Sequence, residues 1–314
     1  MNQADRPDVS TAAQPWAAPV LIGICTYRRN AELDRLLADL ASTVERRYDG
    51  FAVGIAVADD NPDLSAREVT ERWSEAFPLG TRWLGVASGN ISAARNALLD
   101  AAVEAEADLC FLDDDEMPDP AWLHELQRVR RSSDADVVIG SVHRRFPADA
   151  PNWLHELPSA LGVTYPDGSV PEVGITGNAL ISVSWLRQSG LRFEAELGTT
   201  GGEDVTFFNT AKGRGANVRY AANSLVWEIV PPARSTFSFQ VGFEFRTGVH
   251  IARFSPDVPV PRLLARAARD MSVGVVRAAA ALPRSRGVAF THLGRAVRGG
   301  GIALGLLGLR LDHK

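Results

Sequence analysis

Short apolar runs alternate with amphipathic stretches along the first half of the chain. Apolar residues fill 20–25, 51–58, 83–86, 109–112 and 137–141, and each run has the length of a buried strand. Between these runs, apolar positions at helical spacing predict helices over 31–44, 65–76 and 93–104. This alternation is typical of βαβ units, so we expect an α/β fold with a Rossmann-like, mostly parallel sheet flanked by helices.

The second half of the chain is less regular from about 145 to 235. Helical spacing returns at 203–212 and at 237–253, and three prolines then precede a last basic stretch. We expect three parts: a loose N-terminal arm over 1–18, one domain over 19–255, and a helical C-terminal extension over 256–314. The apolar run 299–309 is shorter than the roughly 20 residues that a membrane-spanning helix needs.

Composition is that of a globular protein, with 46% hydrophobic and 23% charged residues, which excludes a disordered chain and a disulfide scaffold. The two cysteines, Cys25 and Cys110, stand in apolar runs and predict buried thiols in a reducing compartment. The first residues lack the apolar segment of a secretory signal. We therefore expect a cytoplasmic protein.

Charge is divided unevenly along the chain. Residues 262–314 carry nine arginines and one lysine against two aspartates, a net +8, although the whole chain has a net charge of -5. Arginines at helical spacing, interleaved with Leu and Val, predict an amphipathic helix lying at the anionic inner face of the cell membrane. A helical hairpin packed on the domain, or a dimer contact, is the alternative. The acidic remainder argues against a nucleic-acid partner.

Polar clusters follow three of the predicted strands, at 26–29, 59–61 and 113–115. Because parallel strands end at the same edge of a sheet, we expect the clusters to lie close together. Asp113 and Asp115 can hold Mg²⁺ or Mn²⁺ against a diphosphate, or the triplet is an acidic loop that caps the next helix. Glu203 and Asp204 open a helix after two glycines. They either cap it or supply a base that takes a proton from an attacking hydroxyl.

Seven segments in a fixed order resemble family 2 glycosyltransferases, which have the GT-A fold. They lie between about 20 and 253 and read IGICTYRRN, VADDN, GNISAARNALLDAA, FLDDDEMPDPAWL, TGNALIS, TGGEDVTFF and EIVPPARST. The DDDE and GGED forms are similar to those of bacterial exopolysaccharide enzymes of the succinoglycan glucosyltransferase type. The resemblance covers most of the chain, and it is the order of the segments that makes it specific.

The resemblance implies roles for individual residues. Nucleotide binding falls to Thr26, Tyr27, Asp59, Asp60, Arg95, Asp113 and Asp114, the metal to Asp115 with Asp113, and the catalytic base to Asp204 with Glu203 beside it. Arg95 is otherwise a surface arginine of its helix. Independently of the resemblance, Trp153 is a candidate for stacking on an acceptor sugar, with a core position as the alternative. Asn178 either contacts the acceptor or completes a turn.

Together these features predict an inverting, metal-dependent glycosyltransferase of the hexosyltransferase type. Its donor would be a nucleoside-diphosphate sugar carrying UDP, and its acceptor a hydroxyl of a saccharide or a lipid-linked saccharide in polysaccharide or glycoconjugate synthesis. Two alternatives remain: a sugar-phosphate nucleotidyltransferase, and a non-catalytic, membrane-docked module that binds nucleotide sugars.

Overall fold

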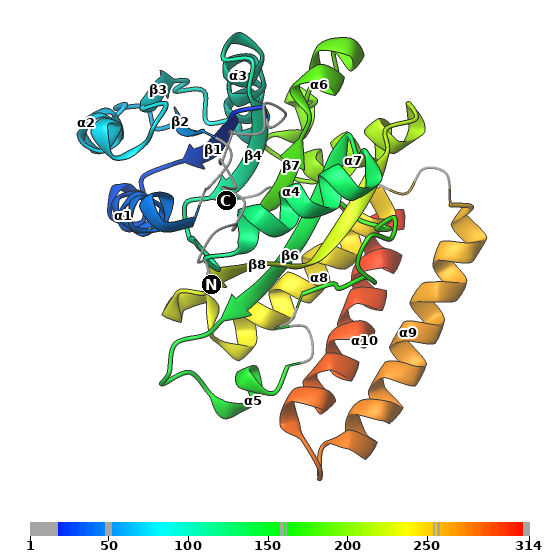
Figure 1. The fold of residues 1–314 in the computed structure, drawn as a ribbon. Helices are drawn as coiled ribbons and strands as arrows, with labels where there is room; N and C mark the ends of the chain where they lie inside the picture. Colours follow the sequence, from blue (N-terminus) through cyan, green and yellow to red (C-terminus); the bar gives the residue numbers. More distant parts are fainter. Residues whose placement is uncertain are drawn as a thin grey trace, which may run out of the picture.

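The computed structural model describes residues 18–47, 52–157, 160, 162–253, 255 and 258–309. Nearly all of the expected N-terminal arm, residues 1–17, and the end of the basic stretch, 310–314, lie outside the described residues. The described part forms one twisted sheet with helices on both faces (Figure 1). This confirms the expected α/β class.

The sheet has the strand order β3-β2-β1-β4-β7-β6-β8-β5 within the described residues. Its strands are β1 (Val20–Thr26), β2 (Val53–Asp59), β3 (Thr81–Gly85), β4 (Asp108–Asp113), β5 (Glu116–Pro118), β6 (Val137–Arg145), β7 (Asn178–Ile181) and β8 (Val218–Ile229). Strands β1 to β4 pair in parallel, β7 runs antiparallel to both of its neighbours, and β6 pairs with β8 in parallel. Short β5 closes the sheet antiparallel to β8.

Two helical layers cover the sheet. Helices α1 (Asn30–Arg47) and α4 (Trp122–Ser133) pack on one face, where Trp122 is almost fully buried. Helices α3 (Ile91–Glu104), α6 (Val183–Ser189) and α7 (Glu203–Gly213) pack on the other, around Phe207 and Phe208. Both faces of β1 and β4 are therefore buried, which explains why these strands read as continuous apolar runs rather than as alternating ones.

The helix expected over 65–76 is broken in two. Helix α2 (Arg67–Arg72) ends before Trp73, and a 3₁₀ turn, η1 (Ser74–Ala76), follows. Trp73 donates its indole N–H to Asp34 of α1 at 2.7 Å, and Phe77 enters the core. These tertiary contacts override the helical spacing. Strands β5, β7 and β8 fall in stretches for which no strand was expected.

The chain ends in long helices. Helix α8 (Phe237–Arg253) is followed by a hairpin of α9 (Val260–Ala281) and α10 (Arg286–Leu306), with α10 packed on both of the others (Figure 1). The glycine run of α10 allows this packing, because a Cβ on Gly301 would collide with the backbone of Phe245 in α8. Gly299, Gly301, Ile302 and Gly305 thus serve helix contact. Among the described residues, no helix has both the length and the apolar composition needed to cross a bilayer.

The remaining short elements connect the larger ones. They are helix α5 (Asn152–His155) and the 3₁₀ turns η3 (Ala195–Leu197) and η4 (Pro232–Arg234). Turn η4 joins β8 to α8, and so brings the start of α8 to the end of the sheet where β4 and β8 finish.

Candidate active site

A polar cavity of about 960 Å³ opens where β1 and β4 end. The strand register explains which residues reach it, because Thr26 lies opposite Asp59 and Cys25 opposite Asp113. Eight of the predicted site residues line the cavity: Thr26, Tyr27, Asp60, Arg95, Asp113, Asp114, Asp115 and Asp204. The structure thus brings together the three polar clusters and the start of α7, as expected from the fold.

The aspartate triplet is held by hydrogen bonds and ion pairs from two sides. Asp114 accepts from the Thr26 hydroxyl at 2.9 Å and from Arg29 at 2.8 Å, while Asp115 accepts from Arg29 at 2.7 Å. Burial raises the pKa of Asp113 to about 7; Arg95 opposes this shift, and the charges of Asp115 and Asp114 add to it. A cation near these three carboxylates would relieve their mutual repulsion.

Glu116, the last residue of the DDDE segment, supports the triplet from behind. It is almost fully buried, and its carboxyl accepts a hydrogen bond from the backbone N–H of Asp113 at 2.8 Å. Burial raises the pKa of Glu116 well above its usual range. A Cβ on Gly177 would collide with this carboxyl, which accounts for the glycine in the TGN segment. Sequence reasoning did not single out Glu116.

The Glu203–Asp204 pair stands at the first turn of α7. Gly201 and Gly202 precede it with φ of +79° and +89°, a left-handed conformation that favours glycine. Glu203 forms a buried ion pair with Arg95 of α3, and Asp204 accepts from the backbone N–H of Val205 at 2.7 Å. Burial raises the pKa of Asp204; the charge of Glu203 adds to the shift and Arg95 opposes it.

The second strand supplies one cavity residue and one structural residue. Asp60 accepts from the Ser88 N–H at 2.7 Å and from the Gly89 N–H at 2.9 Å, which ties the loop after β3 to the cavity. Asp59 is fully buried and is not among the lining residues. Its carboxylate instead accepts from the backbone N–H of Ala66 at 2.8 Å. The expected nucleotide contact of Asp59 is therefore replaced by a role in holding this turn.

Asn178 also turns away from the cavity. It is fully buried, and its amide donates to the carbonyl oxygens of Ser141 and Ser224 at 3.1 and 3.0 Å. These bonds join β7 to β6 and β8 inside the sheet. Thr176 and Gly177, just before it, do line the cavity. The expected acceptor contact at Asn178 is corrected to a structural bridge, because the buried amide already satisfies backbone carbonyls.

Trp153 lies at a different place from the polar cavity. Its ring packs on Phe290 of α10 at a centroid distance of 4.6 Å, and it lines a separate apolar pocket of about 330 Å³ with Phe237 and Leu282. Two other tryptophans are also engaged in packing: Trp185 is in the core, and Trp227 packs against His143. The expected stacking of Trp153 on a sugar in the polar cavity is therefore not what this arrangement provides.

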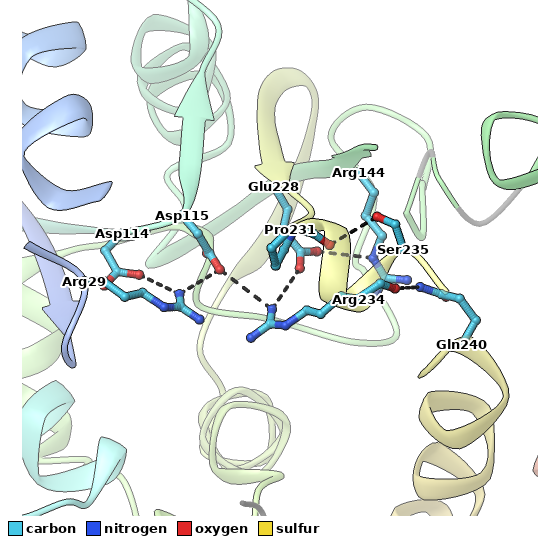
Figure 2. A network of polar contacts seen from close by, with 9 residues as sticks. All are labelled: Arg29, Asp114, Asp115, Arg144, Glu228, Pro231, Arg234, Ser235 and Gln240. Carbon is cyan, nitrogen blue, oxygen red and sulfur yellow. Dashed lines mark hydrogen bonds and ion pairs between the residues drawn. The ribbon is translucent and has the colours of Figure 1, made fainter. Parts of the chain in front are cut away.

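Three charged residues at the cavity wall, Arg144, Glu228 and Arg234, were missed at the level of sequence, and Arg29 stood in the expected polar cluster 26–29 without a role of its own (Figure 2). Arg234 lies 3.8 Å from Asp115 and 3.7 Å from Glu228, which is bonded in turn to Arg144 at 3.2 Å. Arg29 completes the set through Asp114 and Asp115. Glu228 and Arg234 both stand in the EIVPPARST segment and Arg29 in CTYRRN. Their presence in ordered motifs was the available signal.

The carboxylates of Asp113 and Asp115 fit a divalent cation, such as Mg²⁺, that needs only one or two protein ligands. No group of three or more His, Cys, Asp or Glu side chains is arranged as a metal cage in the described part of the chain. Asp113 and Asp115, however, both bring hard oxygen ligands to one polar cavity. Mg²⁺ and similar ions commonly bind one or two carboxylates and complete their shell with water and substrate phosphate. The donor set fits that mode of binding.

The chain matches one protein family and a relative in polysaccharide synthesis. The family model described as Glycosyl transferase family 2 matches residues 21–194. The chain is 32% identical over 229 residues to the succinoglycan biosynthesis protein ExoM of Rhizobium meliloti strain 1021, covering 72% of each chain.

Solved structures share the fold at low identity. S. aureus TarS 1-349 in complex with UDP superposes with a TM-score of 0.51 at 16% identity, covering 90% of this chain and 89% of that one. Full TarS gives 0.52 at 15% identity, covering 90% of this chain and 54% of that one. The family match decides against the two alternatives drawn from the sequence, which were a sugar-phosphate nucleotidyltransferase and a non-catalytic module. The chain belongs to glycosyl transferase family 2, and it is a glycosyltransferase with the GT-A fold.

Proposed function

We propose that this glycosyltransferase moves a sugar from a UDP-sugar to a hydroxyl group of a saccharide or lipid-linked saccharide, with inversion at the sugar C1. One observation carries the proposal: Asp204 faces the same cavity as the Asp113–Asp115 triplet. A base and a phosphate-binding wall in one cavity are the two parts that displacement at C1 requires.

Asp204 is the proposed general base. Its raised pKa makes it a stronger proton acceptor than an ordinary aspartate. As the acceptor oxygen bonds to C1, its proton passes to the Asp204 carboxylate, and the bond from C1 to the diphosphate oxygen breaks. Attack from the face opposite the leaving group inverts C1. Arg95, paired with Glu203, holds the first turn of α7 against α3 and keeps Asp204 directed into the cavity.

The other end of the cavity is the proposed donor site. Thr26, Tyr27 and Asp60 stand beside the expected position of the nucleoside, and the triplet beside that of the diphosphate. Asp115 and Asp113 would hold Mg²⁺ or Mn²⁺ together with the donor phosphates, and the ion would neutralise the charge of the departing UDP. The UDP complex of TarS, which shares the fold, supports a UDP donor.

The proposed acceptor class rests on the similarity to ExoM and on the basic tail, which is the C-terminal extension over residues 256–314. ExoM is named as a succinoglycan biosynthesis protein, which supports polysaccharide synthesis. Helix α9 presents exposed apolar residues, Val260, Leu264, Met271 and Val275, along one line. With about 3.6 residues per turn, the arginines of the same helix, Arg262, Arg266, Arg269 and Arg277, lie on the other side of the helix from this line, so α9 has an apolar edge and a basic edge. We propose that both edges contact an anionic lipid leaflet, which would hold the enzyme at the cytoplasmic face of the membrane.

Replacement of Asp204 by Asn tests the proposed base. We expect turnover, measured as UDP release from a panel of UDP-sugars with acceptor present, to fall at least about 100-fold, within the range for loss of a general base. UDP binding should stay within a few-fold of wild type.

Asp119→Asn is the matched control for Asp204→Asn. Asp119 also stands at the start of a helix and accepts a backbone N–H, from Ala121 at 3.0 Å, but it lies outside the cavity. Near-normal turnover in a folded Asp204→Asn protein would contradict the assignment of the base.

A further inference from the structure

One wall of the cavity holds a chain of alternating charges (Figure 2). Going along it, Arg29 joins Asp114 and Asp115, Arg234 joins Asp115 and Glu228, and Glu228 ends on Arg144. The same oxygen of Asp115, Oδ2, faces both Arg29 and Arg234. Two guanidinium groups therefore approach the carboxylate that the proposed function assigns to the cation.

The charges of this chain are balanced without any metal. Three carboxylates, those of Asp114, Asp115 and Glu228, meet three guanidinium groups, those of Arg29, Arg144 and Arg234. A divalent cation arriving alone between Asp113 and Asp115 would bring two positive charges to the one further carboxylate, that of Asp113, so excess positive charge would remain beside Arg29. A diphosphate arriving with it restores the balance. Electrostatics thus favours binding of the cation and the diphosphate together.

Arg234 is the member of the chain that is best placed to change partners. Its contacts, 3.8 Å to Asp115 and 3.7 Å to Glu228, are longer than the 2.7 Å contact from Arg29 to Asp115. Its backbone is fixed, since its N–H donates to Pro231 at 2.9 Å and its carbonyl accepts from Gln240 at 2.9 Å (Figure 2). A long side chain on a fixed turn can move between neighbouring anions at little cost.

We propose that Arg234, with Arg29, binds the diphosphate of the donor and stands as the counterion of Asp115 when no donor is bound. Donor binding draws the guanidinium groups from Asp115 to the phosphate oxygens and leaves Asp115 to the cation. This inference rests on the proposed function, because it takes Asp115 as the cation ligand. It assigns a binding role to two residues outside the predicted site, and it makes cation and nucleotide binding mutually dependent.

The test measures the binding of UDP and Mn²⁺ to the full chain by calorimetry, each with and without the other. For wild type we expect weak Mn²⁺ binding alone and tighter binding with UDP, with the same factor in both directions. Arg234→Gln should bind Mn²⁺ alone about threefold more tightly, because one competing cation is gone. It should bind UDP with Mn²⁺ about tenfold more weakly, the loss of one charged hydrogen bond. The coupling between the two ligands should shrink.

Three further variants separate this role from a general charge effect. Arg144→Gln removes the same charge from the same wall, but among the described residues Arg144 forms its ion pair with Glu228 and none with Asp115, so the effects on both ligands should be smaller. Arg128→Gln breaks a double ion pair, with Glu125 and Asp167, on the far surface and should change neither affinity. Arg234→Lys keeps the charge and should restore most of the UDP affinity. Circular dichroism checks that each variant is folded.

Some outcomes would overturn the proposal. Unchanged UDP affinity in Arg234→Gln excludes the diphosphate contact, and unchanged Mn²⁺ affinity without UDP excludes the counterion role. If Arg144→Gln changed both affinities as much as Arg234→Gln does, the effects would come from the overall charge of the cavity, and both proposed roles of Arg234 would be wrong. If Mn²⁺ has no effect on UDP binding to wild type, the cation of the proposed function is wrong. A tenfold loss of UDP affinity in Arg234→Gln without metal would then still support the diphosphate contact.

Discussion

At the scale of single residues, burial sets the chemistry of the cavity more than sequence position does. Asp113 and Asp204 are ordinary aspartates in the sequence, yet burial raises the pKa of both. Arg95 opposes both shifts from a buried position on α3. One arginine thus influences both Asp113, on the proposed phosphate side of the cavity, and Asp204, the proposed base.

At saturating Mn²⁺, which would keep Asp113 ionised, the pH dependence of activity should follow Asp204. A raised pKa means that the carboxylate takes up its proton at a higher pH than an ordinary aspartate, near 3.9. Activity therefore falls on acidification in a higher pH range. Glu203→Gln removes a charge that raises this pKa, so the acid limb of kcat/KM should move to lower pH. Glu196→Gln, an exposed glutamate of η3, should not move it. An unmoved or upward-moved acid limb in Glu203→Gln contradicts this account.

His143 gives a second pH prediction, on stability. It lies opposite Trp227 in the sheet, and neither ring nitrogen has a hydrogen-bond partner in the described structure. Burial lowers its pKa, so the unfolded chain takes up the proton first as the pH falls below about 6.5, and the folded state loses stability there. His143→Phe should lose less stability than wild type between pH 7.5 and pH 5.0 in thermal melts. A melting difference that is constant over this range would speak against it.

At the scale of elements, the spacing of apolar residues correctly predicted the strands and helices whose burial pattern is regular. Strands β1, β2 and β4 and helices α3, α7 and α8 lie close to the expected ranges, because their burial is continuous or lies on one helical stripe. The prediction of one continuous helix over 65–76 was wrong, because Trp73 donates a hydrogen bond to Asp34 of α1 where α2 ends. Strand β8 was missed because its partners are β5 and β6, which pair with it only in the folded chain.

The glycines of α10 make a prediction at this scale. Gly301→Ala should destabilise the protein by about 1–3 kcal/mol, because the added methyl meets the backbone of Phe245. Gly300→Ala, one residue earlier, has open space around the same position and should stabilise by up to about 1 kcal/mol through helix propensity. Unfolding by urea measures both. Equal effects of the two substitutions would show that α10 does not pack closely on α8.

At the scale of the whole molecule, the basic tail is both a packed and an exposed element. Ile302 of α10 is fully buried, and Leu263 of α9 nearly so, so the expected alternative of a hairpin packed on the domain is part of the structure. The outer side of α9 nonetheless keeps Leu264 and Val275 about half exposed. The proposed membrane contact would therefore use a different face of the hairpin from the one that packs on the domain.

Membrane contact is tested by flotation with vesicles that contain anionic lipid. The triple substitution of Arg262, Arg277 and Arg284 by Gln should weaken binding at least about tenfold, given about 1 kcal/mol for each charge near the leaflet. Substitution of Arg67, Arg82 and Arg192, exposed arginines outside the tail, removes the same charge and should have little effect. If both triple variants lost vesicle binding equally, net charge alone would explain the binding, which would contradict a membrane-facing tail.

The sequence by itself determined the class of fold, the family, and eight of the residues that line the cavity. Those features depend on local burial period and on short ordered motifs, both of which are properties of neighbouring residues. Tertiary structure decided the rest. Asp59 is buried because it accepts from the backbone N–H of Ala66 in the turn after its strand, and Asn178 because it bridges backbone carbonyls of β6 and β8. Arg29, Glu228 and Arg234 form one charged chain because β1, β4, β8 and η4 meet at one end of the sheet. Contacts of that range leave no period in a sequence.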